Sequence, residues 1–284
     1  MTPLVIGHRG ASAYRPENTL EAFELAFRLG ADAIEFDVVP TADGHLIIRH
    51  EPELTGTTDV ASVAALADKA RVDEWFSHDL TLSEVKLLHA RERLAGERSG
   101  SAAFDGKFLV PSLDELLAAD FIAGKTLVLE IKHGDEYLAA GIDLVAMVVK
   151  ALAAADWQAR AVKLIVEAFD YETLQRAKLA LGPVAKYVYL VEHNEVALWG
   201  SPGECLVAAV QAGFDGVSFD KRLVTRELVR QAHAADLSIF AYTLRAEEAE
   251  NSVEEYYAHY IELGLDGLFA DHPDLLRQVV DGLA

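Results

Sequence analysis

The chain has 284 residues, of which 51% are hydrophobic and 8% aromatic. This composition supports a large core and excludes a disordered chain, and the length suits a single α/β barrel of roughly 250 residues. The net charge is −21, from 25 basic and 46 acidic residues. We therefore expect no binding to nucleic acid and no stable association with an anionic membrane, and any phosphate must be captured by local cations.

Two further features narrow the class of protein. No apolar run approaches the roughly 20 residues that span a bilayer, and the first apolar stretch is too short for an export signal. We expect a cytoplasmic protein, with the periplasm open if a signal has been removed. The single cysteine, Cys205, excludes an internal disulfide and a cysteine-cluster metal site, and we expect it to be a small buried side chain. The oligomeric state is left open.

Strand and helix patterns alternate along the chain. Apolar, β-branched residues predict strands at 4–8 and 32–38, and helical spacing predicts a helix at 18–29 between them. Further strands are predicted at 126–132, 162–167, 185–190, 215–219, 238–243 and 266–270, and helices at 112–120, 135–155, 170–181, 203–212, 225–236 and 246–263. Eight strands, mostly separated by helices, predict a (β/α)₈ TIM barrel. A doubly wound open sheet is the alternative, but its Gly-rich phosphate turn is missing after the first strand.

Residues 45–50 interrupt the alternation. They read as a strand, but residues 40–44 before them are too few for a helix, and Asp43-Gly44 between apolar runs is a hairpin signal. We therefore predict an extra antiparallel strand that folds back on the second strand. This hairpin places His50 opposite roughly residues 36–37 and beside Asp37.

The pattern loosens between residues 51 and 110. Turn-rich stretches surround one predicted helix at 82–95, capped near Thr81. Loops of this length are usually functional. We predict that 51–110 is an insertion packed over the barrel mouth and that 1–284 form a single catalytic domain.

Charged side chains on the predicted strands indicate a metal site. Strand residues two apart share a face, so Glu35 and Asp37 point the same way, as do Glu130 and Lys132. Charges on buried strands are costly unless they are paired or bound to metal. Three carboxylates at a barrel mouth predict a site for Mg²⁺ or Ca²⁺. The alternative is a set of structural ion pairs with Lys132 and Arg9.

His8 and His50 are the candidates for proton transfer, because histidine titrates near neutral pH. Arg9 carries a fork suited to phosphate, or it pairs with a neighbouring carboxylate. Glu17 opens the first helix, where it could orient His8, bind a ligand or act as a first-turn helix acid. The remaining residues at strand ends are expected to be solvating or structural: Glu167, Glu192, Ser218, Tyr242 and Asp271.

These motifs resemble the glycerophosphodiester phosphodiesterase family, in order and over nearly the whole chain. They are His8-Arg9-Gly10, Pro16-Glu17-Asn18-Thr19, Glu35-Phe36-Asp37, Asp43-Gly44, His50, Glu130-Ile131-Lys132 and Asp266-Gly267-Leu268-Phe269-Ala270-Asp271. Further segments resemble the longer-insertion, periplasmic-type branch of this family. They are Thr57-Thr58-Asp59-Val60-Ala61, Trp75-Phe76, Leu80-Thr81-Leu82, Pro111-Ser112-Leu113 and Asp220-Lys221-Arg222-Leu223.

The resemblance implies a barrel that hydrolyses glycerophosphodiesters to sn-glycerol 3-phosphate and an alcohol. The residues implied to act are the metal ligands Glu35, Asp37 and Glu130, the acid–base pair His8 and His50, and the phosphate-contacting Arg9 and Lys132. It also implies that the substrate's own glycerol hydroxyl attacks phosphorus and that water then opens the cyclic phosphate.

The chain departs from the family pattern at three positions. Glu51 stands where Asp is usual, Ala168 where Ser is common, and Ala270 where Thr usually precedes the final Asp. We expect these differences to affect substrate preference and not the acid–base or metal residues.

Two other functions remain open. A lysophospholipase D-like activity would use the same catalytic residues, but it requires an apolar face on the insertion, for which Trp75, Phe76 and Phe104 are candidates. A catalytically inactive barrel that binds glycerol phosphates is the other alternative.

Overall fold

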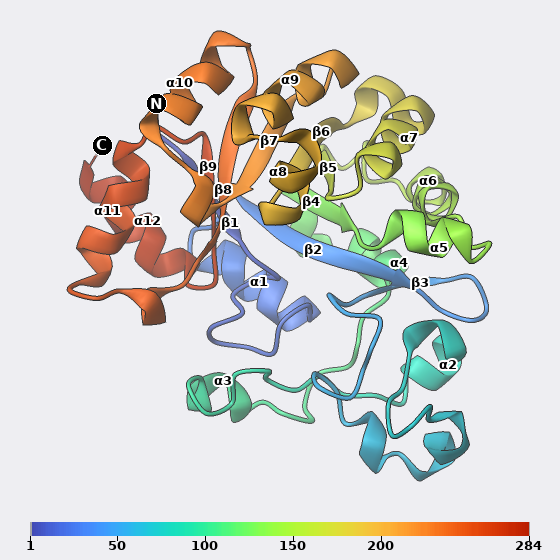
Figure 1. The fold of residues 1–284 in the computed structure, drawn as a ribbon. Coiled ribbons are helices and arrows are strands. Elements are labelled where there is room, and N and C mark those ends of the chain that lie inside the picture. The colour runs from blue at the N-terminus through green and yellow to red at the C-terminus, as the bar shows by residue number, and fades with distance from the viewer. Residues whose placement is uncertain (1, 284) are drawn as a thin grey trace.

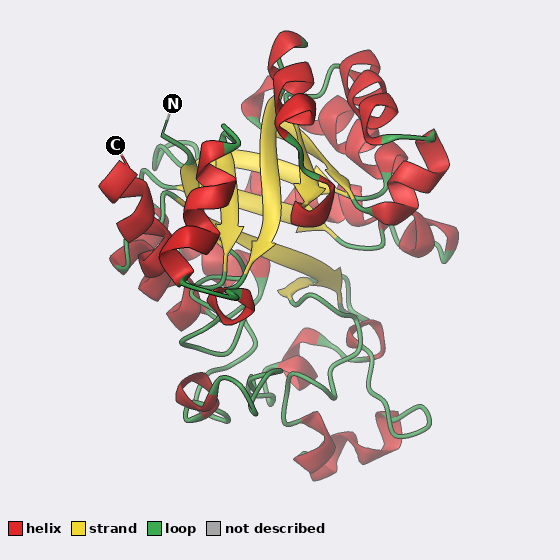
Figure 2. Cartoon of the chain, turned by 60° about the vertical axis from the view of Figure 1, so that its left-hand side comes forward, coloured by secondary structure: helices red, strands yellow, loops and turns green. Residues whose placement is uncertain are grey.

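The computed structural model describes residues 2–283, and its centre is a closed ring of eight parallel strands (Figures 1 and 2). The ring strands are β1 (Leu4–Gly7), β2 (Ala33–Pro40), β4 (Thr126–Ile131), β5 (Lys163–Ala168), β6 (Lys186–Val191), β7 (Gly216–Asp220), β8 (Ser238–Leu244) and β9 (Gly267–Ala270). β1 pairs in parallel with both β2 and β9, which closes the ring. The predicted (β/α)₈ TIM barrel is confirmed.

Helices surround the ring. The α-helices are α1 (Leu20–Arg28), α2 (Leu82–Val85), α3 (Ser99–Ala102), α4 (Leu113–Ala118), α5 (Gly134–Ala139), α6 (Leu144–Ala154), α7 (Tyr171–Leu181), α8 (His193–Trp199), α9 (Pro202–Ala212), α10 (Arg226–Ala234), α11 (Val253–Glu262) and α12 (Pro273–Leu283). Short 3₁₀ turns are η1 (Val60–Ser62), η2 (Ala64–Lys69), η3 (Ser77–Asp79), η4 (Asp120–Ile122), η5 (Gly182–Val184), η6 (Lys221–Leu223) and η7 (Ala246–Glu248). Within residues 2–283, no helix combines the length and apolar character that a membrane crossing requires.

The main core lies between the strands and these helices. α1 illustrates how the sequence builds it: the Thr19 side chain accepts a hydrogen bond from the Ala22 amide and caps the helix. One face of α1 then packs Phe23 against Phe36 of β2, with ring centroids 5.9 Å apart. Burying an aromatic side chain of this size contributes roughly 1.5–3 kcal/mol. Cys205 is buried in the same core, as predicted.

Inside the ring, an apolar layer supports a polar one. The apolar layer consists of Ile6, Ala33, Val128, Ile165, Val188, Phe240 and Phe269. Strand residues two apart share a face, so the next residues toward the carboxyl ends are His8, Glu35, Glu130, Glu167, Leu190, Tyr242 and Asp271. The polar layer therefore lies at the end of the barrel where TIM-barrel sites occur.

The predicted hairpin is confirmed. β3 (Leu46–Ile48) runs antiparallel to β2. Beyond the last paired residue, the Arg49 amide donates to the Asp37 carbonyl at 3.1 Å. Arg49 therefore lies opposite Asp37, and His50 follows one residue further along, within the range that the turn predicts.

The predicted helix over 82–95 is wrong. Only α2 forms there, and the chain beyond it is irregular; Ala90 makes an isolated bridge with Thr58. The local sequence has helical spacing, but pairing with a distant segment of the insertion outweighs that propensity.

Other helices differ in extent or were not predicted. The predicted helix 135–155 is two helices, α5 and α6, separated at Gly141, which has a φ of +85°. The helix predicted from residue 246 begins at Val253, because the Ser252 side chain caps it there. α8 and α12 were not predicted.

The insertion has a small core of its own. This cluster joins the β2–β3 hairpin to the insertion and consists of Val39, Ile47, Leu54, Val60, Leu66, Trp75, Leu80, Val85, Leu88 and Val110. Figure 1 shows the segment, in cyan and teal, beyond β3 and α1 and away from α7–α9. The insertion therefore lies at one side of the barrel mouth.

Candidate active site

A cavity of about 890 Å³ opens at the carboxyl ends of the strands. Six of the eight predicted site residues line it, namely His8, Arg9, Glu35, His50, Glu130 and Lys132. Glu17 and Asp37 are not among the lining residues. Of the described residues that line the cavity, none comes from 51–110, so the insertion predicted over the barrel mouth does not form the cavity wall.

Three buried carboxylates converge on the floor of this cavity. Oxygen atoms of Glu35, Glu130 and Glu167 all lie within 4.8 Å of one another. Burial raises the pKa of Glu130 to about 7, although the Lys132 ammonium opposes the shift. Burial and neighbouring carboxylates hold the pKa values of Glu35 and Glu167 well above their usual range. Such a set is stabilised by a hard, oxygen-liganded cation, so the donor chemistry fits Mg²⁺ or Ca²⁺.

Glu167 was not predicted as part of this group. Its Oε2 atom is buried and makes no hydrogen bond within residues 2–283, which is costly unless a ligand completes it. Its Cα pairs in register with that of Glu130 on the next strand. The sequence did carry a signal, because Glu167 is the one acidic residue of its strand and lies two positions beyond Ile165.

Asp37 was predicted as a metal ligand, but it is surrounded by cations and donors. It accepts a hydrogen bond from Asn18 Nδ2 at 2.8 Å and lies 3.3 Å from Lys132 Nζ and 3.6 Å from Arg9 Nε. Burial opposes ionisation, but the Lys132, His50 and Arg9 charges hold the pKa of Asp37 well below its usual range. The ion pairs considered as the alternative are therefore present around this carboxylate.

Arg9 and Lys132 supply the positive charge of the cavity. The Arg9 amide donates to Glu35 Oε2 at 2.9 Å, and its guanidinium donates to Glu17 Oε1 at 3.1 Å. Lys132 Nζ lies 2.6 Å from Glu130 Oε1. Burial opposes protonation, but the Glu130 and Asp37 carboxylates raise the pKa of Lys132. Both side chains are therefore cationic at neutral pH and can hold a phosphate.

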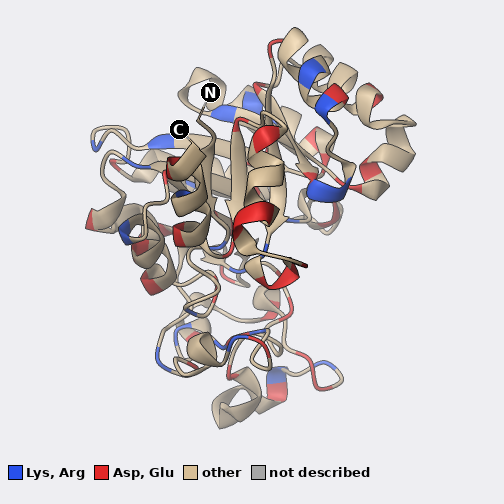
Figure 3. Cartoon of the chain, turned by 90° about the vertical axis from the view of Figure 1, so that its left-hand side faces the viewer, with Lys and Arg blue, Asp and Glu red and all other residues tan. Residues whose placement is uncertain are grey.

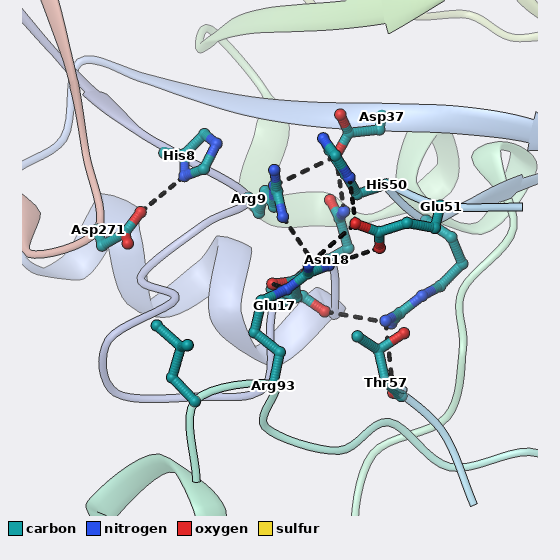
Figure 4. A network of polar contacts seen from close by, with 12 residues as sticks. His8, Arg9, Glu17, Asn18, Asp37, His50, Glu51, Thr57, Arg93 and Asp271 are labelled. Carbon is teal, nitrogen blue, oxygen red and sulfur yellow. Dashed lines mark hydrogen bonds and ion pairs between the residues drawn. The ribbon is translucent and has the colours of Figure 1, made fainter. Parts of the chain in front are cut away.

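Each predicted catalytic histidine is held by a carboxylate (Figure 4). His8 Nδ1 lies 2.6 Å from Asp271 Oδ1, and His50 Nδ1 lies 2.6 Å from Glu51 Oε1. An ionised carboxylate only accepts hydrogen bonds, so each Nδ1 carries the proton and each Nε2 is left for proton transfer. Burial and the Arg9 charge lower the pKa of His8 to about 4, and burial lowers the pKa of His50.

Two expectations about these partners are corrected. Orienting His8 was one of three roles left open for Glu17, but the partner of His8 is Asp271, which was expected to be structural or solvating. Glu17 instead accepts hydrogen bonds from Arg93 Nε at 2.6 Å and Arg93 Nη2 at 2.7 Å. Asp271 could have been found from the strand pattern, because it follows Phe269 by two residues and therefore shares its inward face.

Comparisons with known proteins agree with this site. The model of the Glycerophosphoryl diester phosphodiesterase family matches residues 8–275. A glycerophosphodiester phosphodiesterase of Caldanaerobacter subterraneus is 30% identical over 99% of this chain and 98% of its own length. One of Bacillus subtilis is 27% identical over 98% of this chain and 87% of its own length.

Solved structures are similar over the whole chain. One from Silicibacter pomeroyi, described as a candidate glycerophosphoryl diester phosphodiesterase, has a TM-score of 0.82 at 28% identity and covers 99% of this chain and 94% of that one. An Oleispira antarctica phosphodiesterase, 24% identical over 99% of this chain and 97% of its own, shares the fold with a TM-score of 0.75. The chain therefore belongs to the glycerophosphoryl diester phosphodiesterase family and is an enzyme of that class.

Proposed function

We propose that this enzyme hydrolyses glycerophosphodiesters to sn-glycerol 3-phosphate and an alcohol, with a divalent cation and with His8 and His50 moving the protons. The observation that carries the proposal is the joint lining of one cavity by three kinds of group. Two carboxylate-held histidines, two buried cations and three converging carboxylates all face the same space. The Oleispira antarctica relative is described in complex with sn-glycerol-3-phosphate, which accords with this product.

The phosphate is held by Arg9 and Lys132, whose positive charges neutralise the diester. One histidine accepts a proton through Nε2 from the attacking hydroxyl, and the other donates a proton to the departing alcohol. We propose that the attacking hydroxyl belongs to the substrate's own glycerol and that water opens the cyclic phosphate in a second step.

Glu35, Glu130 and Glu167 are the proposed ligands of Mg²⁺ or Ca²⁺. Asp37 lies next to this group, because Lys132 forms ion pairs with both Asp37 and Glu130. When bound, the cation stabilises the negative charge that develops on a phosphoryl oxygen and lowers the pKa of a coordinated hydroxyl. Lys132 holds Asp37 and Glu130 on either side of its ammonium, so it fixes the spacing between the phosphate and the carboxylates.

We assign the alcohol to the part of the cavity that Phe169, Tyr242, Glu192 and Glu195 line. The Phe169 ring centroid lies 5.4 Å from Lys132 Nζ, and the ring stands at 88° to that of Tyr242. Glu192 and Glu195 also line the cavity. Aromatic faces and carboxylates attract organic cations, so we propose an amino alcohol such as choline or ethanolamine as the favoured head group.

No observation favours the lysophospholipase D-like alternative. Trp75 is only 8% exposed and belongs to the small core of the insertion. No described residue of the insertion lines the cavity, so the apolar face that an acyl chain requires is not provided there.

The test is release of sn-glycerol 3-phosphate and choline from glycerophosphocholine by the purified chain. We expect activity that is lost on chelation and restored by Mg²⁺ or Ca²⁺. His8→Ala and His50→Ala should each lower kcat by roughly 10²- to 10⁴-fold, the usual contribution of general acid–base catalysis. His133→Ala is the matched control, because His133 lines the cavity and its partner among the described residues is the exposed Glu136.

Three outcomes would contradict the proposal. A preference for the acylated analogue would support the lysophospholipase D-like alternative. Binding of glycerol phosphates without turnover would indicate an inactive barrel. An activity unaffected by chelation would remove the role proposed for the three carboxylates.

A further inference from the structure

We propose that Arg93 and Arg98 of the insertion are positioning residues for both catalytic histidines. Each arginine binds the carboxylate that holds the Nδ1 atom of one histidine. This role rests on the proton-transfer function proposed above for His8 and His50. It assigns the insertion a part in the reaction although no described residue between 51 and 110 lines the cavity.

Arg93 fixes the carboxylate that holds His50. Its Nη1 and Nη2 atoms donate to the two oxygens of Glu51 at 2.9 and 2.6 Å. The same Glu51 Oε1 lies 2.6 Å from His50 Nδ1. Two parallel hydrogen bonds from a planar guanidinium set both the position and the plane of a carboxylate. Glu51 is one methylene longer than the usual Asp, so it gains a rotatable bond that Arg93 restrains.

The same guanidinium reaches the phosphate-binding side of the site. Arg93 Nε and Nη2 donate to Glu17 at 2.6 and 2.7 Å, and Glu17 in turn accepts from Arg9 at 3.1 Å. Glu17 is buried, with only 7% of its side chain exposed. One residue of the insertion therefore connects the carboxylate of His50 with the carboxylate that orients Arg9.

Arg98 does the same for His8. Its Nη2 atom donates to Asp271 Oδ2 at 2.6 Å, while the other Asp271 oxygen lies 2.6 Å from His8 Nδ1. Arg98 is itself held, because its Nε donates to Glu247 at 2.8 Å and only 5% of its side chain is exposed. Arg245 also donates to Asp271 Oδ2, at 3.2 Å, so the Asp271 carboxylate keeps one cation if Arg98 is removed.

The segment that carries both arginines is held in place by its own hydrogen bonds. The Glu92 amide donates to Asp105 Oδ1 at 2.7 Å, and the Leu94 amide donates to Glu92 Oε1 at 2.8 Å. Glu92 is buried. This irregular segment carries Arg93, whose side chain reaches Glu17 and Glu51 in Figure 4. Arg98 follows just beyond it and reaches Asp271.

A positioning role for Arg93 and Arg98 differs from a merely structural role because it affects the proton-transfer step. Loss of either arginine frees the carboxylate of one histidine, so the imidazole samples orientations in which Nε2 misses the reacting oxygen. This lowers kcat. Within residues 2–283 the charged partners of Arg98 are Glu247 and Asp271, not the groups that bind phosphate, so its loss should leave KM unchanged. Loss of Arg93 also frees Glu17 and should raise KM.

The experiment measures kcat and KM on glycerophosphocholine for Arg93→Met and Arg98→Met. Removing a group that orients a catalytic ligand typically lowers activity by roughly 10- to 100-fold, and we expect a kcat loss of that size for Arg93→Met. The loss for Arg98→Met should be smaller, because Arg245 remains. Arg91→Met is the matched control, since Arg91 lies on the same segment but is exposed; it should behave as the parent.

A second substrate identifies which histidine each arginine serves. A 4-nitrophenyl ester of glycerol phosphate has a leaving group that departs without protonation. The variant that disturbs the acid histidine should recover most of its kcat on this ester, and the variant that disturbs the base histidine should not. Arg93→Lys and Arg98→Lys keep the charge without the fork, so each should restore part of the lost kcat.

Two results would overturn the proposal. The first is a kcat within about twofold of the parent for both Met variants, which means no loss of transition-state stabilisation. The second is a loss of kcat that follows only the folded fraction, measured by circular dichroism, with identical losses on both esters and for the Lys variants. Failure of the proposed function is distinguishable, because the parent chain itself would then release no sn-glycerol 3-phosphate.

Discussion

The buried carboxylates of the site differ in how many hydrogen-bond donors and positive charges the protein places around them. Asp37 is surrounded by an amide donor, an ammonium and a guanidinium. Glu167 has one oxygen without a hydrogen bond from any described residue and lies among other carboxylates. An acid that lacks a counter-charge within the protein gains most from an added cation.

We therefore expect Glu167→Gln to weaken the binding of Mg²⁺ or Ca²⁺ more than Asp37→Asn does. The measurement is the increase in melting temperature as the cation is titrated into metal-free protein. Replacing the Glu167 carboxylate with an amide keeps the shape of the side chain and removes its charge, so folding should be preserved. A larger loss for Asp37→Asn would return Asp37 to the first place among the metal ligands.

The pKa of Glu130 makes the stability of the metal-free protein depend on pH. Burial raises this pKa from 4.5 to about 7. Below pH 4.5 both the folded and the unfolded state are protonated, and as the pH rises toward 7 only the unfolded state releases its proton freely. The free energy of unfolding therefore falls, by about 3 kcal/mol for an isolated group with this shift.

A bound cation removes that penalty, because it binds the ionised carboxylates. We expect Mg²⁺ or Ca²⁺ to raise the free energy of unfolding much more above pH 7 than below pH 4.5. Urea titrations at the two pH values, with the cation and with a chelator, measure the difference. Equal stabilisation at both pH values would mean that the cation binds elsewhere.

Glu167 and Asp271 were not predicted as site residues, and the same cause applies to both. Residue types and the i, i+2 spacing were enough to place six of the eight predicted residues around the cavity. That spacing does not say which layers of neighbouring strands lie level, because the stagger between strands is set only when the ring closes. The i, i+2 spacing puts the side chains of Glu167 and Asp271 on the inward face, but only the stagger of the closed ring brings Glu167 level with Glu130 and Asp271 beside His8.

At the scale of the elements, the backbone of α1 lies close to Gly10, just after β1. This close approach limits the size of the side chain that position 10 can carry. Gly10 has a φ of +86°, and a Cβ atom there would lie 2.6 Å from the Ala22 carbonyl carbon. Gly44 in the β2–β3 turn has a similar φ of +79°, but a Cβ atom there would have no neighbouring atom within 4 Å. The two glycines share the backbone requirement, and only Gly10 has the steric one.

Gly10→Ala should therefore lower the free energy of unfolding more than Gly44→Ala does. We expect about 1 kcal/mol from backbone strain at Gly44 and about 1–3 kcal/mol more at Gly10 from the overlap with α1. Chemical denaturation of both variants measures the difference. Equal losses would mean that α1 moves away from Gly10 without cost.

The barrel elements were predictable because each strand is an apolar, β-branched run between turn residues, and each such run forms the same kind of strand whatever its neighbours. The insertion was not predictable in this way. Residues 82–95 have helical spacing, yet Ala90 pairs with Thr58, which no local pattern reveals. Arg93 and Arg98 lie in or just beyond this mispredicted segment, so their contacts with the site could not be expected from the sequence.

The whole molecule carries a strong negative charge, and Figure 3 shows acidic residues on barrel helices and on the insertion alike. The cavity is also mostly acidic. Its lysine and arginine lining residues are Arg9 and Lys132. Six further acidic side chains line the cavity from the segments that follow β4, β5 and β6, namely Asp135, Glu136, Asp170, Glu172, Glu192 and Glu195. A substrate with net negative charge is therefore repelled until it reaches the two cations.

Salt should relieve this repulsion. For glycerophosphoglycerol, which is anionic, we expect kcat/KM to rise as the ionic strength increases to about 0.15 M, where the screening length is about 8 Å. Glycerophosphocholine has no net charge and should change little, which makes it the internal control. A fall in kcat/KM for both substrates would mean that the two local cations outweigh the field of the molecule.

His8 directly follows the first strand of the ring, and Asp271 follows the last, 263 positions later. During synthesis His8 is therefore made long before the carboxylate that holds it. The partner arrives only with the final strand, together with the contact that closes the ring. We therefore expect a chain that stops before residue 267 to be inactive, because it would carry Arg9 and both histidines but neither the carboxylate that holds His8 nor the strand that closes the ring.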